Sequence, residues 1–188
     1  MIDWATLFNE SHPEAGASDE IIAQFVASVL EPLSGEEIAV INRRQQNPFP
    51  KSDLLHATFR PFDPTHWVLP NPLLPASYLA FLRWSNGGAF RTGGREFGFF
   101  PALGSGCGVR AMMLGYELPE YMPGALPIAF NGGGTFYLLD MRKPARNGEY
   151  PIVCSHSGNL GWDADECVPI ADSFPNACRG TVNVDELR

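Results

Sequence analysis

Cys154 and His156 have the spacing and side-chain chemistry of a reactive pair. They stand two positions apart in a strand-like run, so their side chains would share one face of a strand. A thiol beside an imidazole can act as a nucleophile with its base, or supply half of a metal site. A buried thiol next to a turn histidine has the same pattern, and His12, His56 and His66 offer no better partner. We therefore assign no catalytic residue.

A second candidate for chemistry is the glycine-rich loop 104–108, which follows a strand-like run and precedes a short helical pattern. Glycines in that setting can hold a phosphate group at a helix N-terminus. The dinucleotide pattern G-x-G-x-x-G fails because Val109 occupies its last position, and no lysine follows as in a P-loop. Ser105 and Cys107 lack the surroundings of a nucleophile elbow. An ordinary flexible loop is the better interpretation, and no cofactor is predicted.

Trp162 is followed by three acidic residues, Asp163, Asp165 and Glu166. A calcium loop needs a further oxygen ligand, a glycine and a distal glutamate at fixed spacing, so no metal site is predicted. A solvated acidic turn, or a core tryptophan at a turn, would explain the cluster. An exposed aromatic side chain ringed by charge is also the composition of an interface hot spot. These four residues are therefore the predicted partner-binding residues, with the other two interpretations left open.

Two further features favour a structural role. Asn131 opens a run with Gly132, Gly133 and a third glycine, and Asn-Gly is a strong hairpin signal in which glycines permit positive φ. Asp140 ends a strand-like run immediately before Met141, a position that suits capping of a turn.

Composition and charge limit the class of protein. The 188 residues are 45% hydrophobic and 18% charged, which suits one globular domain. The formal net charge of −8 repels phosphate backbones and suits a basic protein partner, although acidity also serves solubility alone. We expect no nucleic-acid binding. No apolar run is long enough to cross a bilayer and the N-terminus lacks a signal-peptide pattern, so we predict no membrane association and a cytoplasmic location.

The four cysteines, Cys107, Cys154, Cys167 and Cys178, show no C-x-x-C spacing, so neither a zinc knuckle nor a thioredoxin motif is supported. Cys154 and Cys167 are expected to be buried thiols.

Two helices are predicted within residues 18–47. Ser18 can cap the first, and Ser34 with Glu37 can form a capping box for the second. Residues 48–73 are rich in proline, so they cannot stay regular for long, yet they are too aromatic for a free linker. We expect an ordered insertion that wraps across the core.

A strand pattern begins beyond residue 88. Strands are predicted at 89–92, 95–100, 126–130, 135–140, 150–155 and 166–170. Tight turns between consecutive strands imply antiparallel neighbours. Because the helices cluster before the strands, we predict an α+β fold: a single domain whose mostly antiparallel sheet of about six strands has helices packed on one face.

Residues 74–88, between these two halves, show the pattern of a short helix. Its signals are a proline in the first turn, an apolar stripe and an Asn-Gly-Gly end that accepts a left-handed conformation. The residues concerned are Pro75 at the start, Tyr78, Phe81 and Leu82 on the stripe, and Asn86, Gly87 and Gly88 at the end.

This helix resembles the hallmark of the SUKH superfamily, which includes Smi/Knr-type regulators of cell-wall assembly and many bacterial immunity proteins. Three later segments match in the same order: the aromatic run 97–100, the strand–glycine–strand unit 126–140 and the closing segment 168–174. Residues 74–178 are therefore the family-like core of a single SUKH-like domain expected to span residues 1–188.

The resemblance implies binding rather than catalysis. Bacterial members look like immunity proteins that block toxins, and fungal members look like signalling scaffolds. We expect a non-enzymatic, immunity-type module whose partner is a protein such as a basic toxin domain. Two alternatives stay open. One is a small-molecule or metal-dependent enzyme that uses loop 104–108 or the Cys154/His156 region, and the other is a regulatory scaffold or self-associating module.

Overall fold

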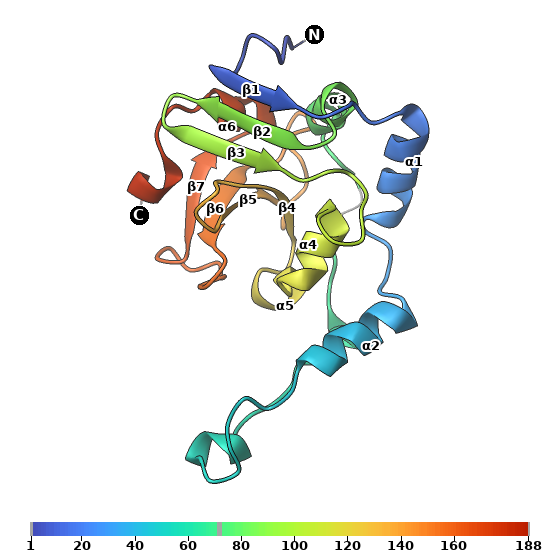
Figure 1. Cartoon of the computed structure of the whole chain (residues 1–188), viewed down its shortest axis with the longest axis vertical. Coiled ribbons are helices and arrows are strands. Elements are labelled where there is room, and N and C mark those ends of the chain that lie inside the picture. The colour runs from blue at the N-terminus through green and yellow to red at the C-terminus, as the bar shows by residue number, and fades with distance from the viewer. Residues whose placement is uncertain (1, 71–72, 188) are drawn as a thin grey trace.

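An antiparallel sheet forms the centre of the protein, seen in a computed structural model that describes residues 2–70 and 73–187 (Figure 1). Its seven strands lie side by side in the order in which they occur in the chain. They are β1 (Glu10–Pro13), β2 (Gly88–Thr92), β3 (Arg95–Phe99), β4 (Ala125–Phe130), β5 (Thr135–Asp140), β6 (Ile152–His156) and β7 (Cys167–Ala171).

Six α-helices and three short 3₁₀ helices occur in the described residues. The α-helices are α1 (Asp19–Ser28), α2 (Gly35–Arg44), α3 (Ala76–Trp84), α4 (Val109–Gly115), α5 (Leu118–Tyr121) and α6 (Phe174–Arg179). The 3₁₀ helices are η1 (Leu54–Ala57), η2 (Pro64–His66) and η3 (Val184–Leu187). Within this described part, no helix has the length and apolar character that a bilayer crossing requires.

The predicted α+β fold, a single domain built on an antiparallel sheet, is confirmed, with seven strands instead of about six. The additional strand is β1, whose residues Glu10 and Pro13 lie opposite Arg91 and Gly88 of β2. All of β1 is exposed and its sequence is polar, so no alternation marks it as a strand. Its conformation is set by pairing with β2 rather than by its own pattern.

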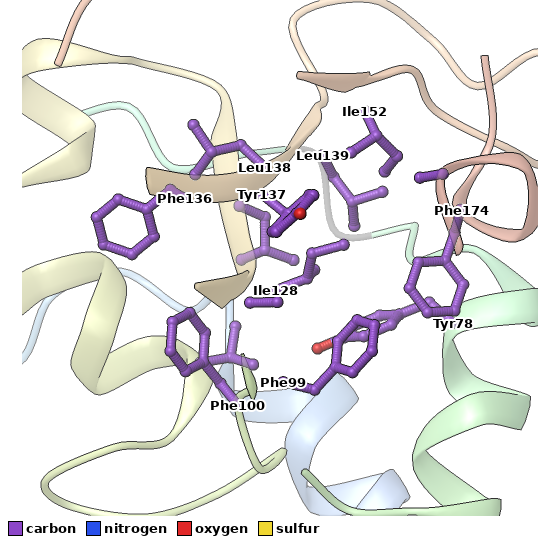
Figure 2. Close-up of a cluster of buried hydrophobic side chains, with 14 of the residues drawn as sticks. Tyr78, Phe99, Phe100, Ile128, Phe136, Tyr137, Leu138, Leu139, Ile152 and Phe174 are labelled. Carbon is purple, nitrogen blue, oxygen red and sulfur yellow. The ribbon is translucent and has the colours of Figure 1, made fainter. Parts of the chain in front are cut away.

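Helices cover both faces of the central strands, a wider arrangement than the one-face packing expected from the sequence. On one face, Phe81 of α3 packs on Phe99 of β3 with ring centroids 4.4 Å apart. On the other face, Tyr116 at the end of α4 packs on Phe136 of β5 at 4.9 Å. Figure 2 shows Phe136 and Phe174 on opposite sides of this core. The strands β4 and β5 are consequently buried along almost their whole length.

Helix α3 contributes three fully buried side chains to the core, Tyr78, Phe81 and Leu82. Pro75 precedes the helix as its N-cap residue instead of lying in the first turn. The helix ends at Ser85, which has extended φ and ψ and donates its N–H to the carbonyl of Phe81.

The Asn-Gly-Gly segment after α3 directs the chain into β2 and does not itself close the helix. Gly87 and Gly88 have φ values of 107° and 104°. A Cβ at Gly88 would lie 2.6 Å from the carbonyl oxygen of His12, so close approach of β1 requires glycine there. Asn86 holds the other side of the turn, because its side-chain oxygen accepts the N–H of Ala102 at 2.8 Å.

Arg110 of α4 fixes the connection between α1 and α2. Ser34 and Glu37 form the expected capping box of α2. Arg110 donates to both carboxylate oxygens of Glu37, at 2.7 and 2.9 Å. These hydrogen bonds outweigh the effect of burial and lower the pKa of Glu37 to about 2. The same guanidinium donates to carbonyls at the end of α1 and just beyond it, those of Ser28, Val29, Glu31 and Pro32.

Part of the insertion does not wrap across the core as expected. Figure 1 shows that residues 43–61, here called the arm, project away from the sheet beyond the body of α2. The tip is η1, where Leu54 and Leu55 are 91% and 52% exposed. The chain then returns toward α5, where Trp67 donates its indole N–H to Glu120 at 2.7 Å. The returning segment thus packs beside α5, and its Trp67 and Leu69 also contact the hydrophobic core, so only the arm departs from the expected wrap. Residues 71 and 72 of the predicted range lie outside the described residues.

Candidate partner-binding site

Three side chains stack together at Trp162: those of Asp140, Arg142 and Trp162 itself. Arg142 follows β5 and donates two hydrogen bonds of 2.8 Å to the carboxylate of Asp140, the last residue of that strand. The guanidinium carbon of Arg142 lies 3.5 Å from the centroid of the Trp162 ring. Trp162 in turn donates its indole N–H to the carbonyl of Pro123 at 3.2 Å. Three loops that are separate in the sequence are therefore joined by one tryptophan.

The charges inside this stack are matched. Burial would raise the pKa of Asp140, but hydrogen bonds from Arg142 outweigh it and lower that pKa. The same pairing raises the pKa of Arg142. Both groups stay ionised over the neutral range, and the cation lies over the electron-rich face of the indole.

The acidic residues after Trp162 point into solvent or lie across the loop. Asp163 and Asp165 are exposed. Glu166 is half-buried, and its carboxylate leaves no room for a Cβ at Gly161. The carbonyl of Asp163 accepts the N–H groups of Glu166 and Cys167, both at 2.9 Å, which fixes the turn. We call Arg142, Trp162, Asp163, Asp165 and Glu166 the Trp162 patch.

Trp162 is half-buried, between the two environments considered from the sequence. It is not a core residue, because Arg142 covers its ring. It is not fully exposed either, because its indole N–H is used within the fold. The role of these residues in binding a partner remains a prediction.

A cleft of about 340 Å³ adjoins the patch through Pro123. We call it the aromatic cleft, because Phe62 and Trp67 line it together with Pro119 and Glu120. Phe62 also packs edge-on against Tyr121 of α5, with centroids 5.7 Å apart. The returning part of the insertion therefore forms a wall beside the Trp162 patch.

The Asn131 turn is tied to the C-terminal segment. The side-chain oxygen of Asn131 accepts the N–H groups of Gly133 and Thr135, both at 2.9 Å. Its amide group donates to Asp185 at 2.8 Å, and the Thr135 hydroxyl donates to the same carboxylate at 2.8 Å. Gly132 has a φ of 82°. These side chains shape the turn, and the His156 ring and the Ser157 hydroxyl lie beside its Gly134.

Loop 104–108 lines a larger groove of about 650 Å³ between α2 and α4. Ser105 lies in its wall. Glu37 also lines it, but its carboxylate is hydrogen-bonded to Arg110 and its pKa is far too low for a general base. Histidine is absent from the described lining of the groove.

The Cys154/His156 region lies elsewhere, in β6. Cys154 is fully buried opposite Tyr137. His156 uses its ring Nδ1 to accept the N–H of Gly158 at 3.1 Å, the arrangement of a turn histidine. No group of three or more His, Cys, Asp or Glu side chains that could hold a metal occurs in residues 2–70 and 73–187.

Sequence reasoning missed Arg142 as the partner of Trp162 and Glu120 as the partner of Trp67. Each pair joins loops that are distant in the chain, and no spacing rule connects them. The only available signal was that a tryptophan near a surface needs an acceptor for its indole N–H.

Comparison with known proteins supports the resemblance carried by α3. A family model described as the SMI1/KNR4 family (SUKH-1) matches residues 72–176. A comparison with curated proteins gives no match. The matched region includes α3, the strands β2 to β7 and the Trp162 patch, and it covers more than half of the chain. The chain therefore belongs to the SMI1/KNR4 family (SUKH-1).

Proposed function

We propose that this protein is a non-enzymatic, immunity-type module that binds and neutralises a cognate toxin protein in the cytoplasm. The observation that carries the proposal is the Trp162 patch, in which an arginine-backed tryptophan is followed by two exposed carboxylates. An aromatic anchor held rigidly beside unpaired charges is typical of a protein interface. Membership of the SMI1/KNR4 family supports a binding role.

The charge of the chain indicates which kind of partner fits. The formal net charge of −8 favours a basic partner surface and disfavours nucleic acid as the direct ligand. Exposed acids around an aromatic anchor would speed association with a basic toxin domain and make it sensitive to salt.

The test begins with the gene immediately upstream. A basic, toxin-like domain encoded there would be purified, and its binding to this protein measured by calorimetry and by association kinetics. Trp162→Ala should weaken binding at least tenfold, the size typical of a hot spot. Asp165→Lys should lower the association rate and flatten its salt dependence.

The matched control is Glu14→Lys, which reverses another exposed acid outside the patch. If Glu14→Lys lowers the association rate as much as Asp165→Lys, the patch is not the interface. If the toxin domain does not bind and toxicity persists on co-expression, the immunity role is wrong, and a regulatory scaffold with another partner becomes the better reading.

The enzyme alternative is weakened by the separation of the groups it needs. Ser105 lies in the groove beside α2, whereas Cys154 is buried in the sheet and His156 lies at a turn. Turnover of a substrate that Cys154→Ala abolishes, while the protein stays folded, would reverse this ranking.

A further inference from the structure

The arm carries a net positive charge, in contrast to the rest of the protein. Residues 43–61 contain four of the 13 lysines and arginines but one of the 21 acidic residues, a net charge of +3. The remainder of the chain therefore carries −11. This separation is unusual for an element that also projects from the body (Figure 1).

Four cations of the body form ion pairs, whereas Arg95, Lys143, Arg146 and Arg179 of the body form none within the described residues. Arg83, Arg91, Arg110 and Arg142 each form an ion pair with a carboxylate. Within the described residues, the four cations of the arm have no carboxylate within 4.0 Å; they are Arg43, Arg44, Lys51 and Arg60.

The tip of the arm is apolar and uncovered. Leu54 and Leu55 lie side by side in η1 and are 91% and 52% exposed. Lys51 and Arg60 flank them in the sequence, on either side of η1. A pair of exposed leucines between cations fits a pocket that is apolar inside and acidic at its rim.

The same chain provides such a pocket at the base of the arm. Phe62, Trp67 and Pro119 contribute apolar surface to the aromatic cleft, whose accessible lining is otherwise mostly polar. Asp63 and Glu120 supply carboxylates, and that of Glu120 also accepts the indole N–H of Trp67. Val68, which also lines it, is 70% exposed. Figure 1 shows the tip of the arm far from α5, whose residues Pro119 and Glu120 line the cleft, so one molecule does not fill the cleft with its own tip.

We propose that the arm of one molecule docks in the aromatic cleft of a second copy of this chain. Leu54 and Leu55 enter the cleft, and Lys51 and Arg60 face Asp63 and Glu120 of the other copy. Because tip and cleft lie at opposite ends of the same segment, two arms placed antiparallel satisfy both contacts at once. The result is a closed two-fold dimer.

An anionic membrane is the main competing partner for a basic, leucine-tipped projection. The body opposes it, since a charge of −11 is repelled from an anionic surface. Asp53 also lies at the tip, where its carboxylate accepts the N–H of Leu55 at 2.8 Å. A second copy has the same net charge, but it offers two carboxylates, Asp63 and Glu120, at one cleft that also presents apolar side chains.

Sedimentation of the purified full chain tests the proposal from micromolar to near-millimolar concentration. The apparent mass should rise from that of a 20.6 kDa monomer toward twice that value, and added salt should shift the transition to higher concentration. The double variant Leu54→Asp, Leu55→Asp should remain monomeric up to a concentration at least tenfold above that at which the parent dimerises. Both leucines are exposed, so the fold should be retained, and thermal melting checks this.

Leu187→Asp is the matched control, because Leu187 is an exposed leucine outside the arm. It should dimerise as the parent does. A parent protein that stays monomeric at every concentration would overturn the proposal, and so would equal loss of dimer in the control. Since only this protein is present, the outcome is independent of any toxin partner.

Disulfide trapping tests the pairing itself. In a Cys107→Ser background, which removes the exposed thiol, Leu54→Cys and Val68→Cys variants would be mixed under oxidising conditions. The mixed Leu54→Cys/Val68→Cys dimer should form several-fold faster than either homodimer. If homodimers of Leu54→Cys form equally fast, the proposed pairing is wrong. The proposal is also wrong if the parent binds vesicles of anionic lipid and the Leu54→Asp, Leu55→Asp variant does not.

Discussion

The guanidinium of Arg142 lies over the ring of Trp162, with its central carbon 3.5 Å from the ring centroid, although the two residues belong to different loops. Asp140 holds the guanidinium in place with two hydrogen bonds. This relationship keeps the tryptophan half-exposed in one orientation, which is the condition an interface anchor needs.

Removing Arg142 should therefore loosen the patch. Arg142→Ala should lower the free energy of unfolding by about 1 kcal/mol, since both the cation–π contact and the partly exposed ion pair are lost. Urea denaturation measures this. Arg146→Ala, an exposed arginine in the same loop, should change stability by less than about 0.5 kcal/mol. Equal effects from the two substitutions would show that the stack contributes nothing.

Arg110 should be one of the more sensitive surface positions. Arg110→Ala removes two bonds to Glu37 and the bonds to carbonyls around the end of α1, and should cost roughly 2–3 kcal/mol. Hydrogen exchange should accelerate in α2. Arg110→Lys should restore only part of the loss, because one ammonium cannot reach the same set of acceptors. Arg43→Ala is the control, and fast exchange in that variant would argue against a specific role for Arg110.

Glu37 should make stability depend on acid pH. Its pKa falls from an ordinary 4.5 to about 2 in the folded protein, so the unfolded chain binds a proton first. Its contribution is complete above about pH 5 and disappears as the pH falls through 4.5 toward 2. At pH 7, Glu37→Gln should be less stable by roughly 2 kcal/mol, a value reduced for partial exposure.

The difference between Glu37→Gln and the parent should shrink steadily between pH 5 and pH 2, as followed by denaturation at each pH. Glu36→Gln, at the exposed neighbouring position, is the matched control for the substitution itself. A constant gap for Glu37→Gln would mean that its carboxylate titrates normally.

Two buried tyrosines should respond in opposite directions to loss of the hydroxyl. The Tyr78 hydroxyl has no hydrogen-bond partner among the described residues, whereas that of Tyr137 donates to the carbonyl of Glu96 at 2.8 Å. Tyr78→Phe should leave stability unchanged or raise it by about 0.5–1 kcal/mol, and Tyr137→Phe should lower it by about 1 kcal/mol. A marked loss in Tyr78→Phe would reveal a partner for its hydroxyl.

The C-terminal segment should depend on Asp185. Asp185→Ala removes the bonds to Asn131 and Thr135, so residues 180–187 should exchange amide hydrogens faster, with a cost of about 1 kcal/mol. Asn131→Ala should cost about twice as much, because the N–H groups of Gly133 and Thr135 also lose their shared acceptor. Glu186→Ala, next in the chain and exposed, should leave exchange unchanged. If it speeds exchange as Asp185→Ala does, the segment is held by other contacts.

Elements with local signals were predictable from the sequence. Helix α3 has an apolar stripe, α2 has a capping box, and glycine turns join β2 to β3 and β4 to β5. Strand β1 was missed because its polar residues are fixed only by β2. The direction of the arm was also not predictable, since prolines stop a helix without determining where the chain goes next.

The candidate site was predictable only in part. Trp162 and the acids beside it stand out by composition. Arg142 and Pro123, which fix the ring, are brought to it by the sheet and by α5, and no pattern in the sequence links them.

The place of β1 in the sheet affects how the protein is made. Trp4 and Phe8 are synthesised before β2, yet both end buried, and Phe8 packs against Phe90 of β2. Their docking site does not exist until β2 has been synthesised, many tens of residues later. The nascent chain must therefore carry these two aromatic side chains without their docking site until β2 follows, which makes the segment around them a natural binding segment for chaperones.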